Sequence, residues 1–81
     1  MNELTGISET QDDLIKLANR IKSLRLKAGH HHWEKFALNN DIARMQYRNY
    51  ELGKNLTYTS LLKVLKALNI SLSEFFAEGF E

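Results

Sequence analysis

The sequence contains no cysteine and no proline, and only four of its 81 residues are glycine. Without cysteine, disulfides and thiolate-ligated metal sites are excluded. Without proline, the chain lacks the residue that most strongly stops or kinks a helix. Valine occurs once, at Val64, and no segment alternates apolar and polar residues over more than a few positions, as a half-buried strand would. These absences favour an all-helical protein.

Long hydrophobic runs are also missing. The longest apolar run has three residues, for example Phe75–Phe76–Ala77, which is too short for a transmembrane helix or for the apolar part of a secretory signal. A chain of 81 residues is expected to form one small domain with a modest core. We therefore expect a soluble, cytoplasmic protein.

The formal net charge is only +1, but the charges are strongly segregated along the chain. All 11 basic residues lie in 16–66, together with three acidic ones, whereas 1–15 and 67–81 hold seven acidic residues and no basic one. The middle of the chain thus carries +8 and the two ends together −7. Such a positive field is typical of a protein that binds a polyanion. The alternative is that the helix surfaces are simply charged.

Apolar residues recur at helical spacing in five segments, which predict helices at about 10–28, 33–40, 43–52, 58–68 and 72–77. Gly29 is placed to end the first helix. Thr57 is the predicted N-cap of the fourth helix, and Ser71 with Glu74 forms a capping box before the fifth. We expect residues 1–9 to be a flexible arm and residues 10–81 to be a single domain.

The segment 33–53 is the most informative part of the chain, because two short helical patterns meet there at a turn without glycine or proline. Asn39, Asn40 and Asp41 form this turn, and asparagine and aspartate tolerate the left-handed backbone that a sharp helix–helix turn needs. Two short helices at a steep angle leave one face of the second helix free to enter a DNA groove. The side chains expected to pack inward are Phe36, Ala37, Ile42, Tyr47 and Tyr50.

Five groups of residues carry a family resemblance through their joint spacing. They are Ile21–Arg25 with Gly29, Phe36–Ala37, Ile42–Ala43, Tyr50–Lys54 and Leu61–Phe76. In this pattern the chain resembles the lambda-repressor-like, or Cro/C1-type (XRE), helix-turn-helix domains. The resemblance implies an all-α, five-helix DNA-binding domain, with the helix-turn-helix at 33–53 and a recognition helix at about 43–52 in the major groove.

The chain departs from the family pattern at several positions of this motif, of which Asp41 and Trp33 bear most on the site. Asp41 stands where the family usually has glycine in the turn. Trp33 stands where the family often has a glutamine that bonds a phosphate. The resemblance also implies that Arg25 and Glu51 form a structural ion pair between the first and third helices, a pairing that suits bidentate geometry.

One face of the expected third helix turns outward when its tyrosines point into the core. In the family this face meets base edges, which implies base contacts from Arg44, Met45, Arg48 and Asn49. Arginine can bond guanine through two hydrogen bonds, asparagine can bond adenine, and methionine can pack on the thymine methyl group. The alternatives are a phosphate contact or plain solvation for each arginine, and packing against the preceding helix for Met45.

A second set of residues is expected to contact the phosphate backbone, because their types suit phosphate positioning. The set comprises Trp33, Gln46, Lys54, Asn55 and Thr57. For Trp33 the alternative is a place in the core.

The three consecutive histidines His30, His31 and His32 precede this segment. Consecutive residues do not converge easily on one ion, so we expect no metal site. Histidine changes its charge near neutral pH, so these residues at the DNA-facing edge would make binding pH-sensitive.

The sequence therefore predicts a sequence-specific DNA-binding transcriptional regulator, expected to be a repressor associated with the bacterial nucleoid. The C-terminal aromatics Phe75, Phe76 and Phe80 exceed what so short a helix buries, which favours a homodimer; the alternative is that they complete the core. No cofactor, membrane or small-molecule effector is expected. No nucleophile–base pair or metal set indicates an enzyme.

The competing function is a protein-interaction module, for example antitoxin-like, that keeps the fold with weak or no DNA binding. Among regulators, the resemblance extends equally to phage repressors, restriction–modification controllers and antitoxins.

Overall fold

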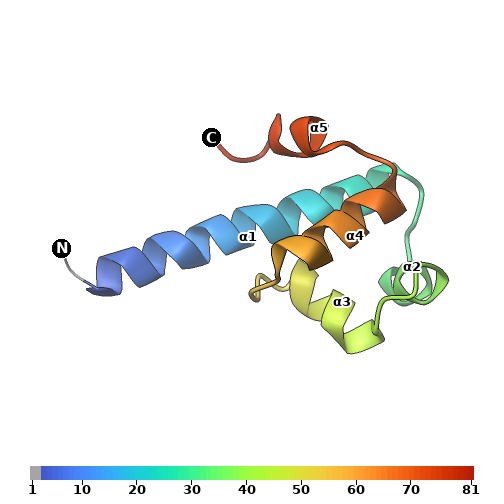
Figure 1. The fold of residues 1–81 in the computed structure, drawn as a ribbon, viewed down its shortest axis with the longest axis horizontal. Coiled ribbons are helices and arrows are strands. Elements are labelled where there is room, and N and C mark those ends of the chain that lie inside the picture. Colours follow the sequence, from blue (N-terminus) through green and yellow to red (C-terminus); the bar gives the residue numbers. More distant parts are fainter. Residues whose placement is uncertain (1–2) are drawn as a thin grey trace.

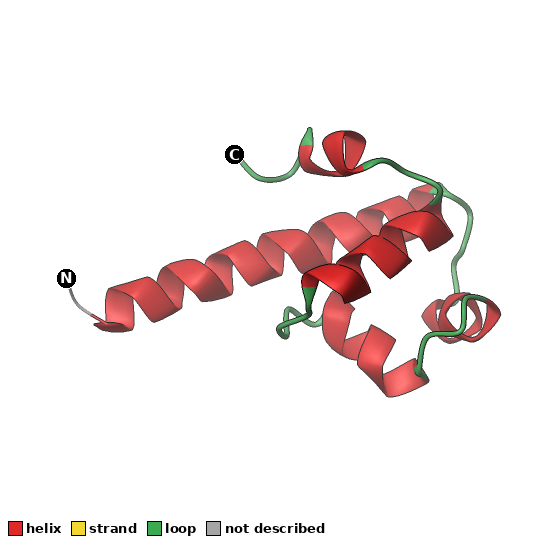
Figure 2. Ribbon diagram, viewed as in Figure 1, coloured by secondary structure: helices red, strands yellow, loops and turns green. Residues whose placement is uncertain are grey.

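The computed structural model describes residues 3–81, with side chains described from Thr10 onward. Within this part the chain forms five α-helices and no strand (Figures 1 and 2), so the predicted all-α, five-helix architecture is confirmed. The helices are α1 (Glu3–Lys27), α2 (Trp33–Asn39), α3 (Arg44–Glu51), α4 (Tyr58–Leu68) and α5 (Leu72–Phe76).

The first helix begins earlier than its sequence pattern indicates. We predicted a start near Thr10, but α1 begins at Glu3 and has 25 residues, which at 1.5 Å per residue span about 37 Å. No proline interrupts this segment, and a helix that is already nucleated extends at little cost. The N-terminal part of α1 projects beyond the other helices (Figure 1). The division into an arm at 1–9 and a domain at 10–81 stays a prediction.

The ends of the helices follow the local signals of the sequence. After α1, Gly29 has a φ of 90°. Its N–H donates to the Leu26 carbonyl at 3.0 Å, and the His30 N–H donates to the Arg25 carbonyl at 3.1 Å, so the two bonds form a Schellman motif. Both hydrogen bonds of the capping box before α5 are present: the Glu74 N–H donates to the Ser71 hydroxyl, and the Ser71 N–H donates to the Glu74 carboxylate. These predicted caps are confirmed.

The turn between α2 and α3 uses the same motif with an aspartate in the glycine position. Asp41 has a φ of 56°. Its N–H donates to the Leu38 carbonyl at 3.4 Å, and the Ile42 N–H donates to the Ala37 carbonyl at 3.0 Å. The predicted left-handed residue in this turn is therefore Asp41. Lys63 of α4 donates to the Asp41 backbone carbonyl at 2.6 Å and holds the turn against α4.

Asp41→Gly is expected to raise the free energy of unfolding by about 0.5 kcal/mol, because the left-handed conformation costs less for glycine than for a residue with a Cβ. The substitution keeps the backbone carbonyl that Lys63 bonds. Urea denaturation measures the change. Asn69→Gly is the matched control, since Asn69 has a φ of 55° and asparagine tolerates this conformation well. A less stable Asp41→Gly protein would contradict the prediction.

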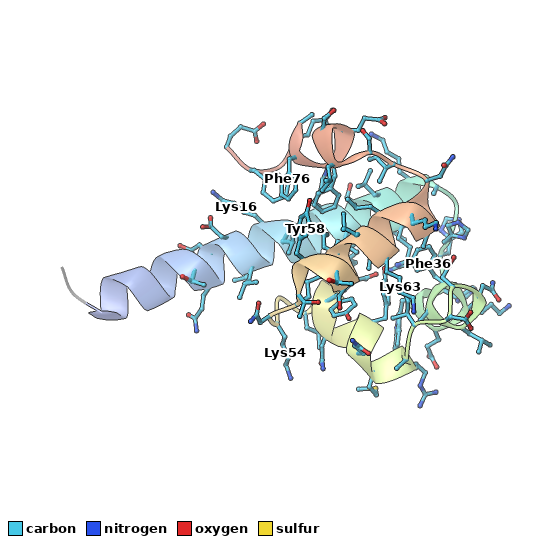
Figure 3. The ribbon with its side chains drawn as sticks, in the orientation of Figure 1. Lys16, Phe36, Lys54, Tyr58, Lys63 and Phe76 are labelled. Atoms are coloured by element: carbon cyan, nitrogen blue, oxygen red, sulfur yellow. The ribbon has the colours of Figure 1, made fainter. Side chains whose placement is uncertain are left out.

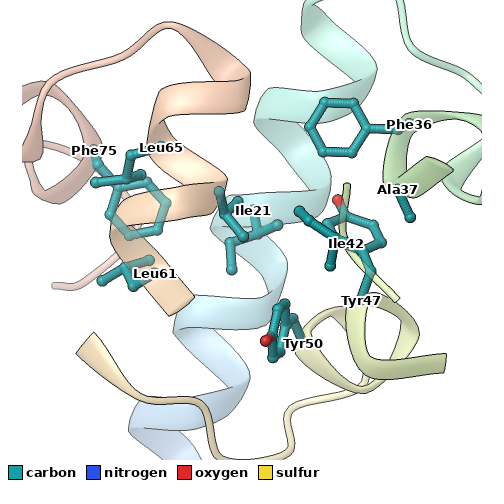
Figure 4. Close-up of a cluster of buried hydrophobic side chains, with 10 residues drawn as sticks. Ile21, Phe36, Ala37, Ile42, Tyr47, Tyr50, Leu61, Leu65 and Phe75 are labelled. Carbon is teal, nitrogen blue, oxygen red and sulfur yellow. The ribbon is translucent and has the colours of Figure 1, made fainter. Parts of the chain in front are cut away.

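The core lies where α1, α3 and α4 meet and extends to α2 and α5. Phe36 and Ala37 come from α2, Tyr47 from α3, and each is 1% exposed or less. Figure 4 shows these side chains on one side of Ile21 of α1, with the α4 and α5 side chains on the other. Because Ala37 is small and fully buried, the backbones of α2 and α3 can approach closely. The buried core cluster comprises Ile21, Phe36, Ala37, Ile42, Tyr47, Tyr50, Leu61, Val64, Leu65 and Phe75.

The short helix α5 is fastened to α1 by one arginine. The Arg20 guanidinium donates to the carbonyls of Phe75 and Glu74, each at 2.8 Å. Both carbonyls lie at the C-terminal end of α5, where a helix lacks donors for its last carbonyls; the Glu74 carbonyl also accepts from the Ala77 N–H at 3.3 Å. The sequence pattern gave no sign of this contact, because the partners are more than 50 positions apart.

Candidate nucleic-acid interface

The third helix is anchored by one face and exposed on the other. Tyr47 and Tyr50 are 0% and 5% exposed and point into the core. On the opposite side Met45 is 59% exposed, so it does not pack closely against α2, which was the alternative for this residue. Arg48 and Asn49 are partly exposed. Arg44 is exposed as well, so the structure brings the four expected base-contacting residues to one accessible face.

Arg44 begins α3 and forms an ion pair with α2. Its Nη1 lies 3.0 Å from Oε2 of Glu34, and the two side chains are 66% and 55% exposed. An exposed pair of this kind adds little to stability. The effect of the ion pair is to orient the Arg44 side chain at the N-terminal end of α3.

Arg48 lies one turn further along the same face. Its guanidinium carbon is 5.1 Å from the ring centroid of Trp33, within the range of a cation–π contact. Trp33 is itself partly buried and packs against the core cluster. The expected phosphate contact of Trp33 remains a prediction, and the alternative core role accounts for the position of its ring.

The other expected phosphate-contacting residues lie on α3 and on the loop after it. Lys54 and Asn55 are exposed, and Lys54 extends on the same side of the molecule as α3 (Figure 3). Gln46 is exposed, but its amide donates to the Tyr50 hydroxyl at 2.6 Å. The Thr57 hydroxyl is engaged as the N-cap of α4, accepting from the Ser60 N–H at 3.1 Å and donating to Oγ of Ser60 at 2.9 Å. Lys54 and Asn55 are therefore the best placed of this set.

The structure brings Arg25 and Glu51 together in a buried bidentate pair. Nε and Nη2 of Arg25 donate to Oε2 and Oε1 of Glu51 at 2.7 and 3.0 Å, and the side chains are only 4% and 1% exposed. Nη1 of Arg25 donates to the His30 carbonyl at 2.6 Å. The hydrogen bonds that Arg25 donates to the Glu51 carboxylate raise the pKa of Arg25 above its usual value. The pair joins α1, the loop before α2 and the last turn of α3.

Tyr47 lies beside this pair, and its hydroxyl has no hydrogen-bond partner among the described residues. Burial raises the pKa of the Tyr47 hydroxyl far above its usual value, and the Glu51 carboxylate adds to the effect. The phenol therefore stays protonated and neutral beside the ion pair.

The sequence profile of a family described as helix-turn-helix, HTH_3, matches residues 21–75, which is more than half of the chain. The chain belongs to this helix-turn-helix family. It is similar to a curated protein described as control protein C.MunI, from Mycoplasma sp, with 35% identity over 68 residues that cover 83% of this chain and 92% of that protein. No solved structure matches the chain.

The predicted membership of the Cro/C1-type (XRE) helix-turn-helix family is thereby confirmed, and the chain is a DNA-binding transcriptional regulator. In helix-turn-helix terms, α2 and α3 with the turn at Asp41 form the motif, and α3 occupies the position of the recognition helix. The Asp41 turn keeps the left-handed geometry that glycine usually supplies. No helix in the described part of the chain is long and apolar enough to cross a membrane.

Contacts of this helix-turn-helix between residues far apart in the chain were missed from the sequence. Glu34 was not singled out, although it pairs with Arg44. Lys63 was not singled out either, although it donates to the Asp41 carbonyl and so contacts the turn. Segments 10 to 22 residues apart make these contacts, so no helical spacing signals them; opposite charge at Glu34 and Arg44 was the one available sign.

All three histidines are exposed, although His30 also contacts the framework. The His30 ring packs against Phe36 with centroids 5.1 Å apart, and its carbonyl accepts from Arg25. His31 and His32 are exposed. Among the residues whose side chains are described, no three histidines or carboxylates gather as a metal site would require.

Proposed function

We propose that this regulator binds a two-fold-related DNA operator as a homodimer and represses transcription, with α3 in the major groove. The observation that carries the proposal is the division of α3 into a buried tyrosine face and an accessible face that holds Arg44, Met45, Arg48 and Asn49. A helix held this firmly can present side chains at fixed positions along a groove.

The residue types on this face suit direct contact with bases. Arg44 and Arg48 would each bond guanine, Asn49 would bond adenine, and Met45 would pack on a thymine methyl group. Lys54 and Asn55, exposed after α3, would hold the phosphate backbone. Lys54 and Asn55 would thus fix the position of the helix-turn-helix on the phosphate backbone, while α3 contacts the base edges in the groove.

The homodimer is proposed through α5 and the adjoining part of α1. Phe75 is buried, but Phe76 is 46% exposed, and its ring lies 4.9 Å from those of both Phe75 and Phe80. Phe76 and Phe80 line a groove with Leu14 and Leu17 of α1. An exposed apolar surface next to a groove is what a self-complementary interface needs.

Among the regulators that the resemblance left open, the similarity to a control protein over nearly its whole length favours the controller class. Such a protein would act in the cytoplasm on DNA of the nucleoid. We propose no catalytic activity and no small-molecule effector.

Selection of bound duplexes from a random DNA pool, at two salt concentrations, tests the proposed function. The expected result is an enriched motif with two half-sites separated by about 34 Å, one turn of DNA, and an affinity that falls as salt rises. Absence of any enriched motif would refute the proposal and favour the interaction module.

Phe76→Ser is expected to weaken the homodimer and to reduce binding to the two-half-site duplex more than binding to a single half-site, because each subunit would then bind alone. Sedimentation and duplex titrations measure the two effects. Leu38→Ser is the matched control, since Leu38 is 77% exposed on α2, away from α5. A wild-type protein that stays monomeric at micromolar concentration, with and without DNA, would contradict the homodimer.

A further inference from the structure

The first turn of α2 contacts both arginines of the proposed base-contacting face. Trp33 lies under the Arg48 guanidinium at 5.1 Å, and Glu34 bonds the Arg44 guanidinium at 3.0 Å. Arg44 and Arg48 are four positions apart and so lie on the same side of α3. Two neighbouring residues of α2 thus hold two neighbouring arginines of α3.

The contact of Trp33 with Arg48 leaves the arginine able to bond DNA. A cation–π contact uses the face of the guanidinium, whereas its N–H donors point outward in the guanidinium plane. The Trp33 ring is fixed because it packs against the core cluster. A partly buried ring under Arg48 therefore restricts the arginine without occupying its donors, which lowers the entropy that binding must remove.

The contact of Glu34 with Arg44 acts in a second way. The pair is more than half exposed, so it contributes little to folding. Near DNA, however, the phosphates repel the Glu34 carboxylate. Arg44 must then either leave Glu34 to bond an acceptor on DNA, or bond Glu34 and the DNA acceptor at the same time. Glu34 thus penalises binding to duplexes that offer Arg44 no guanine, which is a negative contribution to non-specific affinity.

We propose that the first turn of α2 sets the base preference of α3, with Trp33 and Glu34 as positioning residues for Arg48 and Arg44. The inference rests on the proposed function, since it requires that both arginines contact DNA. It gives Trp33 a different role from the phosphate contact that the family resemblance implied.

The test compares Trp33→Leu and Trp33→Phe on two probes: the duplex selected by the wild-type protein and a random-sequence duplex of equal length. Trp33→Leu is expected to lower the preference for the selected duplex by about fivefold, and Trp33→Phe by about twofold, because a phenyl ring retains part of the cation–π contact. Affinity for the random duplex should change little. Combined with Arg48→Ala, Trp33→Leu should cause no further loss.

Glu34→Gln is expected to raise the affinity for the random duplex and to lower the preference for the selected one, since it removes a charge that repels phosphate. A preference that is unchanged in Glu34→Gln would overturn the role of Glu34. Equal losses for Trp33→Leu and Trp33→Phe on both duplexes would overturn the role of Trp33, and would indicate an indole N–H contact with phosphate. If the Trp33 variants lose affinity in proportion to a lower melting temperature, the positioning role of Trp33 would be overturned in favour of a role in the core.

A readout without DNA separates this inference from the proposed function. Trp33 is the one tryptophan of the chain, so its fluorescence reports the Arg48 contact directly, and Arg48→Ala should change its emission. Unchanged emission would overturn the contact itself. Failure to select any duplex would overturn the proposed function and the specificity role together, while a selected duplex with unchanged preference in all three variants would overturn only the inference.

Discussion

Glu51→Gln is expected to lower the free energy of unfolding by about 3 kcal/mol, because removing one partner of a buried ion pair leaves the other charge unpaired. Arg25 is the partner, and its side chain is only 4% exposed. A guanidinium does not lose its proton to escape this cost. Glutamine has nearly the same shape as glutamate and keeps one acceptor oxygen, so the loss reports the charge and one of the two hydrogen bonds. Urea denaturation, followed by circular dichroism, measures the change.

The exposed pair of the same protein is the matched control. Glu34→Gln breaks the Arg44 pair, whose members are 66% and 55% exposed, and should cost less than about 0.5 kcal/mol. Replacing both buried partners, as Arg25→Met with Glu51→Leu, should recover much of the stability, since the desolvation cost disappears with the charges. Similar small losses for Glu51→Gln and Glu34→Gln would show that burial does not determine the value of the Arg25–Glu51 pair.

Features that depend on neighbouring residues were predictable from the sequence. The stop at Gly29, the Thr57 cap, the Ser71–Glu74 box and the left-handed residue at Asp41 each involve residues within a few positions. The inward face of α3 followed from the spacing of Tyr47 and Tyr50. Local propensity and spacing therefore suffice to define the five helices and the accessible face of α3.

Features that depend on how helices cross were not predictable in the same way. The Arg25–Glu51 pair came from the family resemblance, because its partners are 26 positions apart. The contacts of Glu34 with Arg44 and of Arg48 with Trp33 depend on the approach of α2 to α3, which the small, buried Ala37 allows. The early start of α1 was missed for another reason. The helix continues on the N-terminal side of Thr10 to Glu3, and no capping residue is needed at Thr10 for a helix that runs through it.

The crossing of α2 and α3 also bears on the alternatives for Trp33. From the sequence, a phosphate contact and a core position were both open. The ring packs against the core and supports Arg48, so one residue serves the framework and the accessible face together. Trp33, which departs from the family pattern, thus contacts Arg48. Variants designed to change the base preference should therefore substitute Trp33 and Arg48 together.

The double variant Arg44→Ala with Arg48→Ala is expected to lose at least about 30-fold in affinity for the selected duplex, since each bidentate arginine–guanine contact contributes about 1–3 kcal/mol. Stability should be nearly unchanged, because Arg44 is mostly exposed and pairs only at the surface. Affinity for a random duplex should fall less, and the dependence of binding on salt should stay nearly unchanged, because its slope counts phosphate contacts and these arginines are proposed to contact bases. Duplex titration at several salt concentrations, with thermal unfolding in parallel, measures all three effects.

Lys22→Ala with Lys27→Ala removes the same charge from exposed positions of α1 and is the control for a purely electrostatic effect. If this variant loses as much affinity as the arginine variant, the positive field of 16–66 attracts DNA and the accessible face of α3 does not select it. If the arginine variant loses affinity equally on selected and random duplexes, both arginines contact phosphates and the base preference must come from Met45 and Asn49. A large loss confined to the selected duplex is the result that assigns sequence recognition to Arg44 and Arg48.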